Sequence, residues 1–131
     1  MIGLDTNILL RAALDDDATQ SPLAREILSH LTAENPGVVN GVVLAEFAWT
    51  LRRGYDYSRA EILQAIRTML RSRGYAFPDR RAISVALSRC ESDGLNFPDA
   101  LIGEINRTIG CEVTLTFDEK AAKSSAFQRA H

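Results

Sequence analysis

Hydrophobic positions along the chain follow two different spacings. Short apolar runs and one stretch of polar-apolar alternation predict four strands, at residues 2–4, 37–40, 75–77 and 112–116. Elsewhere apolar residues recur every three or four positions and predict helices over 8–14 and 42–53, with others beginning near Ser21, Ser58, Pro78 and Asn96. Residues 119–123 are a candidate short helix and residues 126–128 a candidate edge strand. Strands and helices therefore alternate along the chain.

This alternation predicts the fold class. Strands separated by helices are typical of an α/β fold, in which a mainly parallel sheet is built through right-handed crossovers. A length of 131 residues suits a single domain, so we expect one domain over 1–131. In such folds the residues that follow the strands face the crevice in which ligands bind. Polar side chains at those positions are the candidates for chemistry.

Four acidic residues occupy related positions in the pattern. Asp5 follows the first strand, Glu46 lies on the helix after the second, Asp99 opens a later helix and Asp118 follows the last clear strand. Each has an ordinary alternative explanation. The three aspartates suit the first turn or the N-cap of a helix. Glu46, set among Val42, Val43, Trp49 and Thr50, is expected to be partly desolvated and to form a salt bridge with an arginine unless it binds a metal.

Together the four acids favour a metal site. A parallel sheet brings the ends of its strands to one edge, where neighbouring carboxylates repel each other unless a cation compensates them. No histidine or cysteine joins the set, so Mg²⁺ or Mn²⁺ fits better than zinc. Metal-activated water suits hydrolysis of a phosphodiester. Because an acidic pocket repels a polyanion, arginines would have to bind the nucleic-acid backbone.

The composition bears on nucleic-acid binding, on the state of the cysteines and on the location of the protein. The net charge of −2 gives no general attraction to nucleic acid, but 13 of the 15 basic residues are arginine, several of them in pairs that we expect on a solvated face. Cys90 and Cys111 fit neither a disulfide framework nor a metal site, so we expect both reduced and buried. We also expect Trp49 in the core. The chain opens directly on a strand and has no apolar run of membrane-spanning length, which favours a cytoplasmic protein without membrane contact.

Four segments carry a resemblance to a known family. They are Ile2-Gly3-Leu4-Asp5-Thr6-Asn7-Ile8-Leu9-Leu10-Arg11, Leu44-Ala45-Glu46-Phe47-Ala48-Trp49-Thr50-Leu51, Phe97-Pro98-Asp99-Ala100-Leu101-Ile102 and Leu115-Thr116-Phe117-Asp118. In this order and spacing the chain resembles PIN-domain ribonucleases. More narrowly, it resembles the VapC toxins of bacterial VapBC toxin-antitoxin pairs. The resemblance extends over essentially the whole chain, and the set of four segments is more specific than any one of them.

The resemblance implies a fold, an activity and a site. The fold would be a PIN-like α/β/α sandwich around a mainly parallel sheet of four to five strands. The activity would be that of a Mg²⁺- or Mn²⁺-dependent endoribonuclease acting on structured RNA, such as tRNA or rRNA. Asp5 and Asp99 match the principal metal ligands, Glu46 and Asp118 complete the acidic quartet, and Thr6 and Thr116 match hydroxyl-bearing positions of the pocket.

The resemblance also implies partners. Members of the toxin family form homodimers and are inhibited by a small antitoxin whose C-terminal segment occupies a groove beside the active site. The first two long helices and residues 42–53 are candidates for that groove. Two positions depart from the family pattern: Asn96 replaces an acid and Pro98 an alanine. If the Asn96 position normally helps to bind a second metal, this chain holds one ion or binds the second weakly.

Two alternatives compete with the nuclease. A signalling receiver domain is also a small α/β protein with acids around Mg²⁺, but it requires adjacent acids after the first strand and a lysine after the last. This chain has only Asp5 at the first place, and Lys120 lies beyond Asp118. The second alternative is a non-catalytic PIN-like RNA-binding module, against which the presence of all four acids argues.

Overall fold

The strands of the protein are short and pair only in parallel. In the computed structural model, which describes residues 1–131, β1 (Ile2–Gly3), β2 (Gly37–Val38) and β3 (Tyr75–Ala76) form one sheet in the order β1-β2-β3. A second sheet pairs β4 (Thr114–Thr116) with β5 (Phe127–Arg129). The candidate edge strand therefore forms, one residue later than predicted. Parallel strands alternating with six α-helices confirm the α/β class and are consistent with an α/β/α fold.

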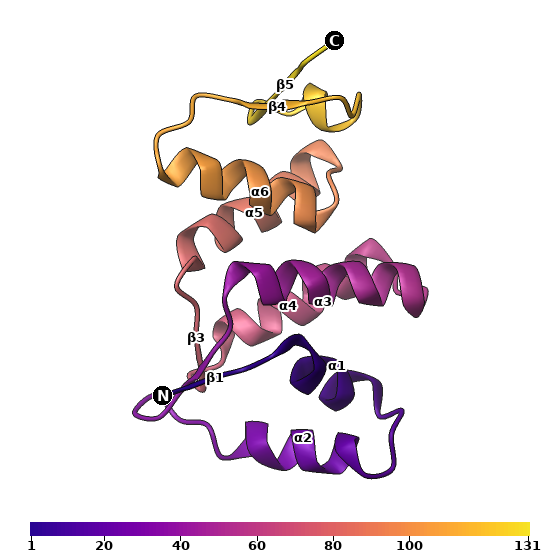
Figure 1. The fold of residues 1–131 in the computed structure, drawn as a ribbon, viewed down its shortest axis with the longest axis vertical. Helices are drawn as coiled ribbons and strands as arrows, with labels where there is room; N and C mark the ends of the chain where they lie inside the picture. Colours follow the sequence, from indigo (N-terminus) through magenta and orange to yellow (C-terminus); the bar gives the residue numbers. More distant parts are fainter. The chain divides into compact units, whose positions relative to one another are not determined.

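The chain divides into two compact units, Met1–Pro78 and Asp79–His131. The first contains β1 to β3 and four helices: α1 (Thr6–Leu14), α2 (Gln20–Ser29), α3 (Gly41–Gly54) and α4 (Arg59–Arg71). The second contains β4 and β5, a 3-10 turn η1 (Ala121–Lys123) and two helices, α5 (Arg80–Asp93) and α6 (Phe97–Thr108) (Figure 1). No helix has the length and hydrophobicity needed to cross a membrane.

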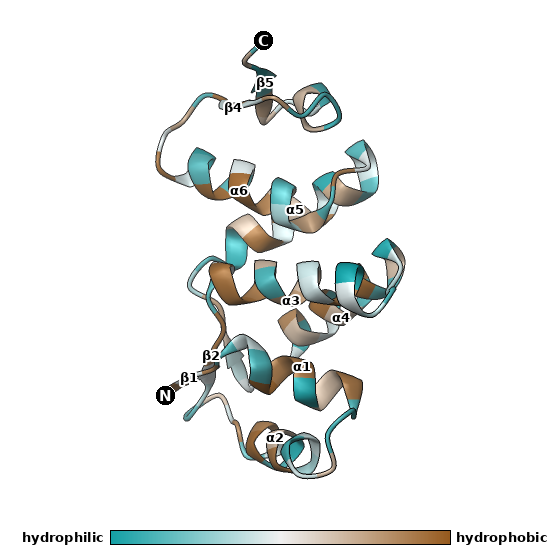
Figure 2. Cartoon of the chain, turned by 45° about the vertical axis from the view of Figure 1, so that its right-hand side comes forward, coloured by the Kyte–Doolittle hydropathy of each residue, from teal (hydrophilic) through white to brown (hydrophobic).

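In the first unit, α3 supplies much of the core. Its inner face is fully buried at Leu44 and Leu51, and these side chains belong to the same core as Val39 after β2 and Ile66 of α4. The outer positions of the helices are largely hydrophilic, so that each helix carries both teal and brown segments in Figure 2. The helix at 42–53 was predicted within a residue of its observed ends, because its apolar spacing is continuous.

The second helix differs from its prediction. The apolar spacing predicted a helix from near Ser21, but α2 begins at Gln20, and its apolar Leu23 is 55% exposed. Asp17 is the reason for the earlier start, because its carboxylate accepts hydrogen bonds from the amides of Thr19 and Gln20 at 2.9 and 2.7 Å. Ser21 is instead fully buried inside the helix.

In the second unit, α5 and α6 pack together and β5 lies against α6. The buried face of α5 is formed by Ile83, Ala86, Leu87 and Cys90, so the predicted burial of Cys90 is confirmed. Cys111, in contrast, is exposed, so the expectation that both cysteines are buried was wrong for this residue. It follows the left-handed Gly110 at the end of α6 and therefore lies on a loop outside the core. Neither cysteine forms a disulfide.

Candidate active site

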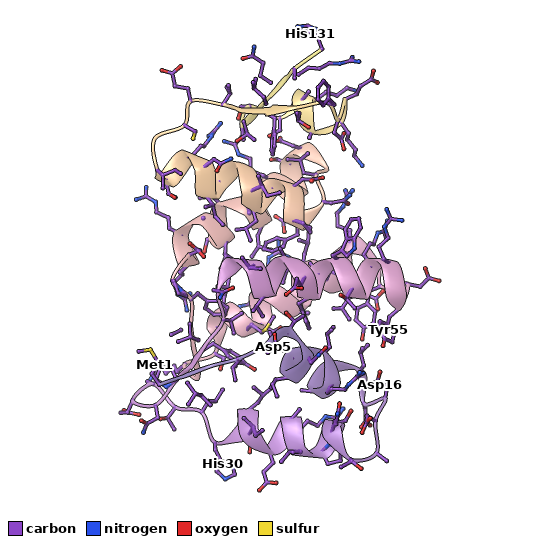
Figure 3. All side chains as sticks on the ribbon, viewed as in Figure 1. Met1, Asp5, Asp16, His30, Tyr55 and His131 are labelled. Carbon is purple, nitrogen blue, oxygen red and sulfur yellow. The ribbon has the colours of Figure 1, made fainter.

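Asp5 lies where β1 leads into α1 (Figure 3). The strand is aligned by its pairing with β2, and just beyond it the amide of Leu4 donates to the Val38 carbonyl at 2.9 Å. Asp5 is the N-cap of α1, and its Oδ1 accepts a hydrogen bond from the Thr6 amide at 2.9 Å. The capping role and a ligand role are compatible, because Asp5 is exposed and only one of its oxygens makes this bond.

Thr6 connects the start of α1 to Glu46 of α3. Its buried hydroxyl donates to Glu46 Oε1 at 2.8 Å, across 40 positions of sequence. Glu46 itself is exposed, so the expectation of partial desolvation was wrong, as was the expected salt bridge to an arginine. The reason is that Glu46 lies on the outer face of α3, with Val42 and Trp49 beside it also exposed. The first unit thus brings together Asp5, Thr6 and Glu46.

The second unit holds the other two acids. Asp99 lies in the first turn of α6 and Asp118 follows β4. Burial raises the pKa of Asp99 above its usual range, and the negative charge of Asp118 raises it further. The two carboxylates are therefore close enough to repel each other.

Asp118 is fixed by backbone hydrogen bonds. Its Oδ1 accepts from the amides of Lys120 and Ala121, at 2.8 and 3.1 Å, so it caps η1 as its cap alternative predicted. Its own amide donates to Thr116 Oγ1 at 3.0 Å. Because this bond uses Thr116 as an acceptor, the hydroxyl hydrogen of Thr116 is free to donate elsewhere.

The candidate residues thus form two groups, one in each unit. Each contains two carboxylates and a threonine hydroxyl: Asp5, Thr6 and Glu46 in the first, and Asp99, Thr116 and Asp118 in the second. None of the four acids forms an ion pair with a basic side chain. In neither unit do three or more histidine, cysteine or acidic side chains form a cluster able to hold a metal ion. The predicted convergence of all four acids remains a prediction.

The donor chemistry of both groups fits a hard cation. Every side-chain ligand on offer is an oxygen, which Mg²⁺ and Mn²⁺ prefer. The pKa of Asp99 is raised mainly by burial and further by the negative charge of Asp118, and no basic side chain pairs with either acid. A divalent ion beside Asp99 and Asp118 would relieve that repulsion, so the residues present fit the metal that the sequence predicts.

The outer face of α3 holds a large aromatic side chain whose exposure was not predicted. Trp49 is 53% exposed, so its assignment to the core was wrong, and the guanidinium of Arg53 lies 4.6 Å from the centre of its ring. The spacing of Val42, Glu46, Trp49 and Arg53 places them in one stripe along the helix. A glutamate and an arginine in that stripe were the signal that it faces solvent. The paired arginines Arg52-Arg53, Arg71/Arg73 and Arg80-Arg81 are exposed, as predicted.

The sequence matches the model of a known protein family. The family model described as PIN domain matches residues 2–126, nearly the whole chain. No curated protein matches the sequence. The match includes all four acids and both threonines of the two groups described above.

Proposed function

Because the chain belongs to the PIN-domain family, whose members are generally nucleases, we propose that it is a metal-dependent endoribonuclease that hydrolyses phosphodiester bonds in structured RNA, such as tRNA or rRNA. The observation that carries the proposal is the family match over residues 2–126, which includes all four acids. Asp99 and Asp118 add support, because the charge of Asp118 contributes to the raised pKa of Asp99 and neither acid has a basic partner. A buried salt bridge would explain such residues structurally, but none is formed. Uncompensated acids with adjacent hydroxyls are typical of a site that binds a divalent cation.

The proposal assigns a role to each candidate residue. Asp5, Glu46, Asp99 and Asp118 would hold Mg²⁺ or Mn²⁺, with Asp5 and Asp99 as the principal ligands. Such an ion, when bound, supplies an activated water and offsets charge on the phosphoryl oxygens.

The protein's own residues provide the positioning. Thr6 holds the Glu46 carboxylate through its hydroxyl, and the amides of η1 hold one oxygen of Asp118. Thr116 retains a hydroxyl hydrogen that can donate to a substrate oxygen. The exposed arginines are available to bind the RNA backbone.

We further propose that this nuclease is the VapC-like cytoplasmic toxin of a type II toxin-antitoxin pair, that it forms a homodimer, and that a VapB-like antitoxin inhibits it. A groove of about 310 Å³ in the first unit supports the antitoxin proposal. It is lined mainly by apolar side chains from α1 to α4, among them Leu9, Leu28, Phe47 and Met69. Leu9, Phe47 and Met69 are each at most 9% exposed, so the groove offers only a narrow apolar opening to an antitoxin segment. The single PIN domain over 1–131 is part of the same proposal.

Cleavage of RNA by the purified chain tests the nuclease proposal. End-labelled total RNA is incubated with Mg²⁺, with Mn²⁺ and with chelator, beside Asp5→Asn and the control Asp16→Asn. Asparagine caps helices as well as aspartate does, so Asp5→Asn should fold normally. Asp16, in the same unit, pairs with Arg11 at 2.8 Å and has no role in the proposed site. We expect discrete metal-dependent cuts from the wild type and Asp16→Asn, and none from Asp5→Asn.

The opposite results are equally informative. Wild-type cleavage by Asp5→Asn would contradict the assigned site. If the folded wild type binds RNA and cuts none in either metal, the chain is the non-catalytic RNA-binding module instead.

A further inference from the structure

The outer stripe of α3 exposes a large aromatic ring beside the proposed site. Glu46 and Trp49 are three positions apart on the helix, so their side chains are neighbours. Trp49 is 53% exposed even though Arg53 covers part of its ring. Tryptophan is enriched at binding interfaces, so a half-exposed indole beside the proposed site is a candidate contact for the substrate.

The core of the first unit does not require this indole. The inner face of α3 is filled by Leu44, Phe47, Ala48 and Leu51, each at most 3% exposed. The helix is also capped at its start, where the Asn40 side chain accepts from the Val43 amide at 3.0 Å. Trp49 therefore adds little to the folding of α3.

The charges around Trp49 favour a polyanion over an apolar protein surface. The positive charges are those of Arg53, which lies on the ring, and of the exposed Arg52, whereas Glu46 on the other side of the ring belongs to the proposed metal site. An arginine stacked on an aromatic ring adds positive charge at a flat apolar surface, which is the combination that single-stranded nucleic acid binds. A helix that docks on a protein would instead present several adjacent apolar residues.

We propose that Trp49 and Arg53 form a platform for an unpaired base of the RNA substrate, next to the phosphate that is cut. The base stacks on the exposed indole, and Arg53 pairs with a neighbouring phosphate. This inference rests on the proposed nuclease function and refines its substrate class, because only RNA with an unpaired, unstacked base at the cleavage site would use the platform. Loops and bulges of structured RNA meet that requirement.

Intrinsic fluorescence tests the proposal directly, because Trp49 is the only tryptophan of the chain. The full chain is titrated, in chelator, with a single-stranded RNA oligonucleotide and with an abasic oligonucleotide of the same length and charge. We expect the first to quench the fluorescence of Trp49 and the second to leave it unchanged. Quenching by both, or by neither, would overturn the platform.

Variants measure how much the platform contributes. With a labelled oligonucleotide, Trp49→Ala should bind roughly ten-fold more weakly, and Trp49→Phe should retain most of the affinity. Tyr55→Ala is the matched control, since Tyr55 is another exposed aromatic, just after α3, and should bind like the wild type. In cleavage assays Trp49→Ala should raise KM and preserve kcat, because stacking acts on binding. Equal affinities of the wild type and Trp49→Ala would contradict the proposal.

The two proposals fail in different ways. If the wild type cuts RNA with metal but its fluorescence does not respond to bases, the platform is wrong and the nuclease stands. If bases quench Trp49 but no RNA is cut in either metal, the platform stands and the nuclease assignment is wrong.

Discussion

Single residues in this protein combine structural and chemical roles. Asp5 caps α1 and Asp118 caps η1, yet each keeps an oxygen that makes no capping bond. Capping fixes the position of a carboxylate at no cost in folding free energy, because the helix requires an acceptor there in any case. The structural explanation of each aspartate is therefore correct and leaves the proposed metal-binding role open.

The pKa of Asp99 makes a prediction about pH. Burial and the charge of Asp118 raise this pKa in the folded protein above its unfolded value. Asp99 therefore favours folding at pH values below its unfolded pKa, and this contribution is lost as the pH rises through the folded pKa. We measure the free energy of unfolding in urea, in the presence of chelator. At neutral pH we expect Asp99→Asn to be at least as stable as the wild type, and at acid pH we expect any difference between the two to disappear.

Asp118→Asn separates the two causes of that shift. Removing the charge of Asp118 should lower the pKa of Asp99 and leave only the increase that burial causes. NMR titration of the Asp99 carboxyl group measures this pKa. Glu119→Gln is the control, because Glu119 is adjacent in sequence but pairs with Arg129 at 3.0 Å. An Asp99 titration that is the same in Asp118→Asn and the wild type would contradict the pairing of these acids.

At the level of elements, interactions between residues close in sequence were easier to predict than contacts between distant residues. The start of α4 near Ser58 was predicted, because the capping box of Ser58 and Glu61 lies entirely within four residues. The hydrogen bond from Thr6 to Glu46 joins residues 40 positions apart, and no local pattern predicts it. Trp49 was misplaced because apolar spacing indicates which face of a helix is buried but not how wide that face is.

The contact between α6 and β5 is an element-level feature that a single substitution tests. A Cβ at Gly103 would lie 2.8 Å from Phe127 Cε2 and 3.1 Å from the Ala126 Cβ. Phe127 is buried and has little room to move, so Gly103→Ala should lower the free energy of unfolding by about 1–3 kcal/mol despite the better helix propensity of alanine.

Chemical denaturation measures this effect. Gly54→Ala is the matched control, since its Cβ would meet only Thr50 Cγ2 at 3.9 Å, an ordinary contact. We expect that control to be neutral or slightly stabilising. A Gly103→Ala protein as stable as the wild type would show that β5 is not packed closely on α6.

For the whole molecule, the order of strands and helices along the chain was enough to predict the fold class. Alternating strands and helices gave the α/β class and the parallel pairing, and the family match over residues 2–126 supports the same fold. The four acids were found from their positions after strands or on the helices that follow them, and Thr6 and Thr116 from the family resemblance. Their division into two groups, each with a threonine bonded to an acid or to its amide, depends on hydrogen bonds that the sequence does not encode locally.

The central claim is that the acids of both units serve one metal-dependent reaction. The most direct test compares kcat/KM for RNA cleavage by Asp5→Asn, Asp99→Asn and the double variant, with Asp16→Asn as control. Substitutions of residues that act as a unit reduce activity non-additively. We therefore expect each single variant to lose nearly all of its kcat/KM. The kcat/KM of the double variant should be no lower than that of the less active single variant. Independent, multiplicative losses, or full activity in either single variant, would contradict the claim.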